Sequence, residues 1–211
     1  INSPDLKMLD MCAAPGSKTG QLLEYLAEAG KQQGKPVTGM VIANDADKNR
    51  AFMLHHQVRR LHSPALLVTC NDASMYPKMF ASESDTKILF DRVLCDVPCS
   101  GDGTLRKTPN IWATWSPHQA FGLHSLQRRI LKRGLSLLKP GGRLVYSTCS
   151  LNPIEDEAVV ASVLNDSHVG NVKLVQVDLP NMQVTPASTS WSVMTSDGEW
   201  HQEFVSGKRL Q

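Results

Sequence analysis

The feature that most constrains the fold is an alternation of short apolar segments with longer segments that have helical spacing. The apolar segments, which we expect to be strands, are 7–11, 39–44, 65–71, 90–95 and 143–148. The expected helices are 17–29, 45–61, 116–138 and a segment that opens at residue 152. Strands and helices that alternate in this order form a largely parallel sheet covered by helices. The sequence therefore predicts an α/β fold with a mostly parallel central sheet and helices on both faces.

The chain has 211 residues, which is enough for one domain with a substantial apolar core. Periodic signals weaken beyond residue 172, where we expect one more strand at 172–179 and then an irregular or hairpin tail from 182 onward. We therefore predict a core at 1–180 and a C-terminal tail at 181–211 that belongs to an incomplete C-terminal region.

Cysteine usage, hydropathy and charge narrow the class of protein. Five cysteines without the dense spacing of a disulfide scaffold indicate reduced thiols in an intracellular compartment. No apolar run approaches the roughly 20 residues of a membrane helix, and residues 1–5 do not resemble a signal peptide. A formal net charge of +2 permits a nucleic-acid partner without requiring one. We expect no membrane partner.

The segment CAAPGSK at 12–18 follows the first expected strand and opens the first expected helix. Small residues and Gly16 let a ligand approach the backbone closely, and the helix N-terminus offers free N–H groups to an anion. The segment lacks both the G-x-G-x-x-G and the phosphate-loop spacings. It is a candidate cofactor loop, and an ordinary strand-to-helix turn is the alternative.

Acidic residues follow the next two expected strands. Asp45 comes after the second strand and Asp72 after the third. Ligands of such sheets bind at the carboxyl ends of the strands, where an acidic residue accepts hydrogen bonds from ribose hydroxyls. Each aspartate taken alone is more often a helix cap or turn former. Both of them beside the small-residue loop favour a bound adenosine whose methionine carboxylate reaches the loop, which describes S-adenosyl-L-methionine.

The ends of the fourth and fifth expected strands carry reactive groups, namely Asp96, Cys99 and Cys149. A thiolate that adds to carbon 6 of cytosine turns carbon 5 into a nucleophile for a sulfonium methyl group. Asp96 is the candidate for stabilising charge at ring nitrogen 3, and Cys99 can assist loss of the carbon 5 proton. Because DNA cytosine-5 methyltransferases use the cysteine of a Pro-Cys pair, the residues alone do not choose between Cys99 and Cys149 as nucleophile.

Competing interpretations apply to the cysteines and tryptophans. A free cysteine usually packs as a small hydrophobic residue, and Cys12, Cys70 and Cys95 fit that interpretation. The chain has no C-x-x-C pair, and we predict no metal site. Trp112 and Trp115 can stack on a base or pack in the core, and core packing is the more common role.

Four segments, LDMCAAPGSKT, VIANDAD, LCDVPCSGDGT and YSTCSLNPIEDEA, resemble the Nop/Sun-domain RNA cytosine-5 methyltransferases, and most closely their eukaryotic tRNA branch. The resemblance covers about residues 6–164. It implies a Rossmann-like methyltransferase fold. It also implies methylation of carbon 5 of cytosine in RNA, with tRNA as the favoured substrate, through a covalent cysteine adduct at carbon 6. It also implies S-adenosyl-L-methionine as cofactor.

The resemblance also implies residue roles. Cys149 is the nucleophile, Cys99 assists product release, and Asp96 contacts the target base. The implied cofactor-binding residues are Cys12, Ala13, Ala14, Pro15, Gly16, Ser17, Lys18, Asp45, Asp72 and Asp96. Lys18 can serve the cofactor or orient the base.

The same resemblance sets expectations about the whole protein. Relatives carry an N-terminal RNA-binding portion, so we expect this chain to be an N-terminally truncated core. The tRNA branch implies residence in the nucleus or nucleolus and an RNA partner, and no obligate protein partner is indicated. The alternatives are a non-catalytic RNA-binding scaffold and a methyltransferase of exocyclic amino groups or proteins, whose D/N-P-P-aromatic turn is replaced here by D-V-P-C.

Overall fold

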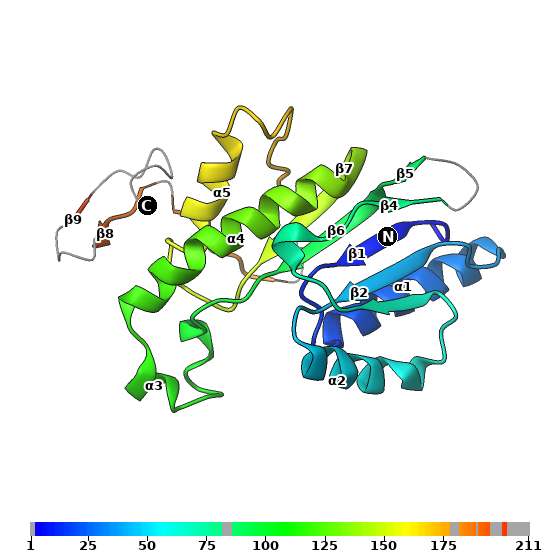
Figure 1. Cartoon of the computed structure of the whole chain (residues 1–211), viewed down its shortest axis with the longest axis horizontal. Coiled ribbons are helices and arrows are strands. Elements are labelled where there is room, and N and C mark those ends of the chain that lie inside the picture. Colours follow the sequence, from blue (N-terminus) through cyan, green and yellow to red (C-terminus); the bar gives the residue numbers. More distant parts are fainter. Residues whose placement is uncertain (1–2, 82–85, 178–181, 189, 195–199, 202–211) are drawn as a thin grey trace. The chain divides into compact units, whose positions relative to one another are not determined.

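The computed structural model describes residues 3–81, 86–177, 182–188, 190–194 and 200–201 (Figure 1). These residues form two compact units. The first unit comprises residues 1–98 and 129–147, and the second comprises residues 99–128 and 148–211.

The first unit is built on a five-stranded sheet. Its strands are β1 (Lys7–Asp10), β2 (Met40–Asn44), β3 (Leu66–Thr69), β6 (Phe90–Asp96) and β7 (Leu138–Ser147). They lie in the order β3-β2-β1-β6-β7, and every neighbouring pair is parallel. Strands β2 and β3 are added on one side of β1, and β6 and β7 on the other side. Sheets of this type bind ligands at the carboxyl ends of the strands, at the point where the strand order reverses. The predicted α/β fold with a mostly parallel sheet is confirmed.

Helices cover both faces of this sheet. On one face, α1 (Ser17–Gln33) packs Leu23 and Leu26 against Met8 and Val41, and α2 (Lys48–Val58) packs against the same side of β2. On the other face lies the C-terminal part of α4 (Pro117–Leu137), where a Cβ atom at Gly134 would stand 2.9 Å from the sulfur of Cys95. Glycine therefore permits the close approach of this part of α4 to the sheet.

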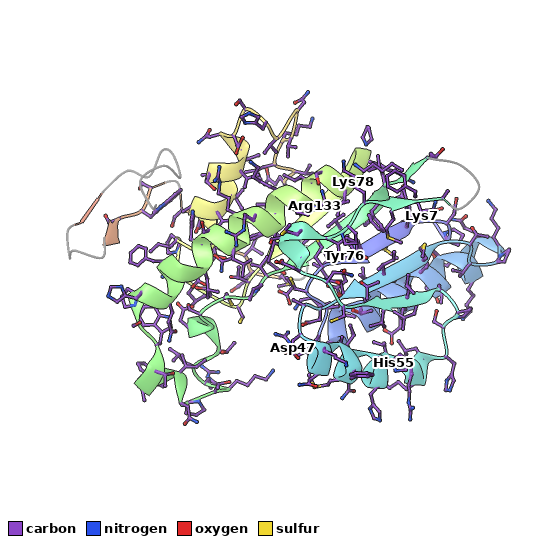
Figure 2. The ribbon with its side chains drawn as sticks, in the orientation of Figure 1. Lys7, Asp47, His55, Tyr76, Lys78 and Arg133 are labelled. Carbon is purple, nitrogen blue, oxygen red and sulfur yellow. The ribbon has the colours of Figure 1, made fainter. Side chains whose placement is uncertain are left out.

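A partly buried arginine ties α4 to the chain after β3. The Nε of Arg133 donates to the backbone oxygen of Tyr76 at 2.7 Å, and Figure 2 labels both residues. Tyr76 is itself buried, and its hydroxyl lies 3.3 Å from that of Thr69 at the end of β3. The turn that follows β3 is thus fixed from two sides.

The remaining elements are short. An antiparallel pair joins β4 (Met79–Phe80) to β5 (Lys87–Ile88), and a second joins β8 (Val193–Met194) to β9 (Trp200–His201). The short helices are α3 (Ile111–Thr114), α5 (Glu157–Leu164) and the 3₁₀ turns Arg59–Leu61, Ala73–Met75 and Asp102–Thr104. No helix among the described residues is both long and apolar enough to cross a membrane.

Several element boundaries differ from expectation for local reasons. Helix α2 begins at residue 48 because the Asp47 side chain accepts from the Arg50 N–H and caps it there. Strand β7 begins at residue 138, five residues early, and an irregularity in its pairing with β6 accommodates the Pro-Gly-Gly segment. Helix α5 begins at residue 157 because residues 153–156 form turns instead.

The strand expected at 172–179 is wrong for the residues that can be judged. Residues 172–177 form no strand and are exposed, and 178–179 lie outside the described residues. An extended segment without a partner strand leaves its backbone groups to water and buries no face. The predicted boundary at 180/181 also falls outside the described residues and stays a prediction.

Candidate functional site

The loop after β1 is held close to the ends of the neighbouring strands. The N–H of Met11 donates to the oxygen of Leu94 at 2.9 Å, and the N–H of Ala13 donates to the oxygen of Asn44 at 2.7 Å. At Gly16, φ is +110°, and a Cβ atom would stand 2.9 Å from Leu54 of α2. A glycine is therefore required for the loop to turn into α1 at this distance from α2.

Asn44, at the end of β2, links three strand ends. Its side-chain N–H₂ donates to the oxygens of Met11 and Asn71, at 3.0 and 2.8 Å. Its side-chain oxygen accepts from the Asn71 N–H at 2.9 Å and from the Thr69 hydroxyl at 3.0 Å. The fully buried amide thus fixes the segments that carry Cys12, Asp45 and Asp72. The sequence placed Asn44 in a strand and gave no sign of this role.

The predicted acidic residues of the first unit have distinct surroundings. Asp45 is buried, accepts from the Ala14 N–H at 3.2 Å and pairs with Arg50 at 3.3 Å. Asp96 accepts from the Lys18 ammonium and from the Ser147 hydroxyl, both at 2.7 Å.

Asp72 is exposed and caps the 3₁₀ turn Ala73–Met75 by accepting from the Ser74 N–H at 2.8 Å. This is the turn-former role that was the competing interpretation. Its neighbour Asn71 still anchors the turn to Asn44, so Asp72 stands at the same edge of the sheet as Asp45.

Asp10, the last residue of β1, was not singled out from the sequence. It is 1% exposed, its Oδ2 accepts from the Thr19 hydroxyl at 2.7 Å, and its Oδ1 is the one carboxylate oxygen without a partner among the buried groups that the structure describes. Burial raises the pKa of Asp10 to about 6, although the Thr19 hydrogen bond opposes the shift. The sequence did carry a signal for Asp10, because an acidic residue at the end of an apolar strand directly precedes a loop of small residues.

The residues of this loop fit a nucleoside cofactor with a methionine tail. The Asp10 Oδ1 can accept from an ammonium group, and no side chain caps the N-terminus of α1, whose N–H groups can therefore bind a carboxylate. Burial, followed by the nearby Asp10, raises the pKa of Cys12 to about 12, so that Cys12 is a neutral thiol here. The loop can therefore bind a carboxylate at the N-terminus of α1 and an ammonium group at Asp10.

The two catalytic candidates of the second unit lie side by side. The sulfurs of Cys99 and Cys149 are 3.2 Å apart, and the Cys149 N–H lies 3.3 Å from the Cys99 sulfur. The Gly103 N–H donates to the Cys149 oxygen at 3.0 Å, and a Cβ atom at Gly103 would stand 2.6 Å from that oxygen. The structure therefore brings together the two thiols that the sequence singled out, and it does so through a contact that only glycine allows.

The surroundings of Cys99 change the ionisation of its thiol. Burial, followed by the hydrogen bond with Cys149, raises the pKa of Cys99 to about 12. Cys99 therefore keeps its proton at neutral pH and can donate it toward the Cys149 sulfur.

The core packing predicted for the other cysteines and the tryptophans is confirmed for some of these residues and wrong for others. Cys95 is fully buried beside the Met11 sulfur, as expected of a small hydrophobic residue. Cys70 is exposed because β3 ends at residue 69, so core packing was wrong for it. Core packing is also wrong for Trp112, which is 76% exposed, whereas the Trp115 indole donates to the Ser100 hydroxyl at 3.0 Å. Within the described ranges, no three His, Cys, Asp or Glu residues are grouped as metal ligands.

Comparison with known proteins identifies the family. A family model described as 16S rRNA methyltransferase RsmB/F matches residues 2–200. The chain is 50% identical over 199 residues to the tRNA (cytosine(34)-C(5))-methyltransferase of Drosophila melanogaster, across 92% of this chain and 26% of that protein. It is 50% identical over 196 residues to the multisite-specific tRNA:(cytosine-C(5))-methyltransferase of Saccharomyces cerevisiae, across 90% of this chain and 28% of that protein.

Solved structures give the same result. NSun6 from Pyrococcus horikoshii, crystallised with SFG, superposes with a TM-score of 0.60 at 30% identity, across 75% of this chain and 36% of that one. A methyltransferase homolog protein from the same organism superposes with a TM-score of 0.56 at 33% identity, across 78% and 46%. The fold is thus that of a methyltransferase.

The chain belongs to the 16S rRNA methyltransferase RsmB/F family, which confirms the resemblance read from its four motifs. It spans roughly a quarter to a third of the length of the curated relatives described above.

Proposed function

We propose that this protein methylates carbon 5 of cytosine in RNA, with S-adenosyl-L-methionine as the methyl donor and Cys149 as the nucleophile. The observation that carries the proposal is the pair of sulfurs 3.2 Å apart, each a few residues beyond the end of one of two paired strands. Two relatives at 50% identity are named tRNA cytosine-C5 methyltransferases, which supports tRNA as the substrate.

The cofactor role falls to the first unit. When bound, S-adenosyl-L-methionine supplies an electrophilic methyl group on a sulfonium. Asp10 would hold the ammonium group, the N-terminus of α1 the carboxylate, and Asp45 the ribose hydroxyls. Residues 12–16 form the loop between these groups, and Ser17 and Lys18 begin α1. Asp72 lies in the turn after β3, where it would accept a hydrogen bond from the adenine amino group.

The covalent step falls to Cys149. Its thiolate adds to carbon 6 of cytosine, the carbon–sulfur bond forms, and the electron pair of the ring double bond makes carbon 5 nucleophilic. Charge that reaches ring nitrogen 3 needs a positioned polar group, and Asp96 with its Lys18 partner is our candidate. Asp96 stands three residues before Cys99, and its hydroxyl partner Ser147 stands two residues before Cys149.

Product release requires loss of the carbon 5 proton and cleavage of the carbon–sulfur bond. Cys99 keeps its proton and hydrogen-bonds to the Cys149 sulfur, so it can pass that proton to the sulfur as the carbon–sulfur bond breaks and take up the carbon 5 proton in exchange. The electron pair of the carbon 5–hydrogen bond then re-forms the ring double bond. Removal of Cys99 should therefore leave adduct formation intact and slow release.

Methyl transfer to unmodified tRNA by the purified protein, read by bisulfite sequencing, tests the proposal. Cys149→Ala should lower the rate by about 1000-fold or more because the nucleophile is lost. Cys99→Ala should accumulate a protein–RNA complex that survives denaturation. Cys70→Ala is the matched control, because Cys70 is an exposed thiol far in sequence from the ends of β6 and β7. It should keep the wild-type rate. A Cys149→Ala protein with the wild-type rate, or a wild-type protein that binds RNA without methylating it, would refute the proposal and favour the scaffold.

The tRNA branch resemblance also supports residence in the nucleus. We propose this location on the resemblance alone. Fluorescence microscopy of the tagged protein in cells tests it, with exclusion from nuclei as the contrary outcome.

A further inference from the structure

Glu155 is a fully buried carboxylate in the second unit, with 0% of its surface exposed. It stands in the turn before α5 and carries no function in the proposed mechanism. A buried carboxylate is costly unless several donors surround it. The positions of those donors therefore show what the side chain holds.

Both segments that bear the thiols supply donors to Glu155. Its Oε1 accepts from the Ser100 backbone N–H at 2.8 Å, and its Oε2 accepts from the Ser150 hydroxyl at 2.8 Å and from the Ser100 hydroxyl. Gln127 of α4 donates to Oε1 at 3.0 Å. Ser100 directly follows Cys99, and Ser150 directly follows Cys149.

One carboxylate therefore bridges the residues adjacent to the two sulfurs. Ser100 is also held by the Trp115 indole at 3.0 Å, and the Ser150 hydroxyl accepts from the Asn152 N–H at 3.0 Å. Each serine is thus oriented so that its hydroxyl proton points at Glu155. Because the bridged serines directly follow the two cysteines, a change in the bridge can alter the separation of the sulfurs.

We propose that Glu155 is a positioning residue that sets the distance between the Cys99 and Cys149 sulfurs, an inference that rests on the proposed function for its catalytic consequence. Replacing the carboxylate by an amide puts an N–H₂ group against donors, which forces at least one serine away. Misplacement of a reacting group by about 1 Å lowers rates by about 100-fold.

Glu155→Gln is the decisive variant, and Glu157→Gln is its matched control. Glu157 undergoes the same chemical change two residues away, where its carboxylate accepts from the Ser188 N–H. We expect kcat for RNA methylation to fall about 100-fold in Glu155→Gln, with KM for RNA and for S-adenosyl-L-methionine changed by less than about threefold. Glu157→Gln should keep the wild-type kcat.

A thiol measurement separates positioning from general damage and does not need activity. Phenylarsine oxide binds two neighbouring thiols at once and loses its oxygen as water, so it should protect Cys99 and Cys149 of the wild type from iodoacetamide. Mass spectrometry of the alkylated peptides reads this protection residue by residue. Protection should be lost in Glu155→Gln and kept in Glu157→Gln.

The outcomes are distinguishable. If Glu155→Gln retains full protection, the positioning role is wrong, whatever happens to the rate. If wild type shows protection that Glu155→Gln lacks, yet wild type methylates no RNA, the positioning role stands and the proposed function fails. If Glu155→Gln does not fold, as judged by its thermal transition, Ser150→Ala takes its place because it removes a single contact with the carboxylate. Ser150→Ala should reduce both the arsenical protection and kcat by about tenfold. Wild-type protection together with a wild-type kcat would overturn the inference.

Discussion

The cofactor loop and the thiol pair are each fixed by one buried polar side chain, but the two side chains differ in kind. Asn44 has a neutral amide that donates to two backbone oxygens and accepts from an N–H and a hydroxyl. Glu155 has a carboxylate that only accepts, and its partners are an amide N–H₂, a backbone N–H and two hydroxyls.

The difference reflects what each region has to join. Backbone segments at strand ends present both N–H and C=O groups, and only an amide matches both. The segments at the thiols present N–H and O–H donors, and a carboxylate can accept from all of them. Asn44→Asp replaces a donor by an acceptor, and Glu155→Gln replaces an acceptor by a donor. Each substitution should therefore damage its own site.

The largest effect outside the thiols should follow from Asn44→Asp. The new carboxylate faces the oxygens of Met11 and Asn71, so two hydrogen bonds become acceptor–acceptor contacts around a buried charge. Unfolding in urea should show a loss of about 3 kcal/mol, because breaking one side of a buried polar network costs this much. Calorimetry should show S-adenosyl-L-methionine binding weakened by at least about tenfold.

Asn71→Asp is the control for this variant. Asn71 contributes backbone groups to the Asn44 network, so its side-chain change leaves those bonds in place. Equal losses in both variants would mean that charge at this edge, rather than the Asn44 amide, controls the loop.

A medium effect should follow from Gly103→Ala in the second unit. The added methyl group would meet the Cys149 backbone oxygen at 2.6 Å, and backbone gives way only by shifting the loop. We expect a loss of stability of about 2 kcal/mol, together with weaker arsenical protection of the thiols.

Gly122→Ala provides the contrast in the same unit. Nothing lies within 4 Å of a Cβ atom at Gly122, inside α4, so alanine should stabilise the protein by up to about 1 kcal/mol. Thermal unfolding of the two variants should therefore shift in opposite directions. Shifts in the same direction would show that the close contact at Gly103 is not what limits substitution there.

The smallest effect concerns pH and Asp10. Its pKa, raised to about 6 by burial, means that the carboxyl is mostly protonated at pH 5 and ionised at pH 7. Since the proposed ammonium partner binds the ionised form, affinity for S-adenosyl-L-methionine should rise about tenfold between pH 5 and pH 7. Calorimetry across this range should show the rise in wild type and a flat profile in Asp10→Asn. A profile that falls with pH would exclude Asp10 as the ammonium partner.

Much of this arrangement could be predicted from the sequence because it depends on local pattern. Apolar runs identified the strands, and parallel strands place their carboxyl ends at one edge, so the residues that follow each strand converge. Cys99 and Cys149 could be paired in this way although 50 positions separate them. The core packing predicted for Cys70 was wrong, because the exposure of its side chain depends on where β3 ends.

The residues that hold the site could not be predicted, because their partners are distant in sequence. In the sequence, Glu155 falls in the first turn of the helix expected to open at residue 152, which is a common place for an acidic residue. Helix α5 instead begins at residue 157, and the Glu155 carboxylate is buried against Ser100, 55 positions away. Asn44 likewise looked like the last residue of a strand, and its partners are fixed only when three strands are side by side.

Identifying the cysteine that bonds to cytosine is the most direct test of the proposed mechanism. The protein is incubated with S-adenosyl-L-methionine and tRNA that contains 5-fluorocytosine, whose fluorine blocks release, and then digested with trypsin and ribonuclease. Mass spectrometry separates peptide 144–173, which holds Cys149, from peptide 93–106, which holds Cys95 and Cys99. We predict the nucleotide adduct on Cys149 in peptide 144–173. An adduct on peptide 93–106, or an adduct that persists in Cys149→Ala, would contradict the account.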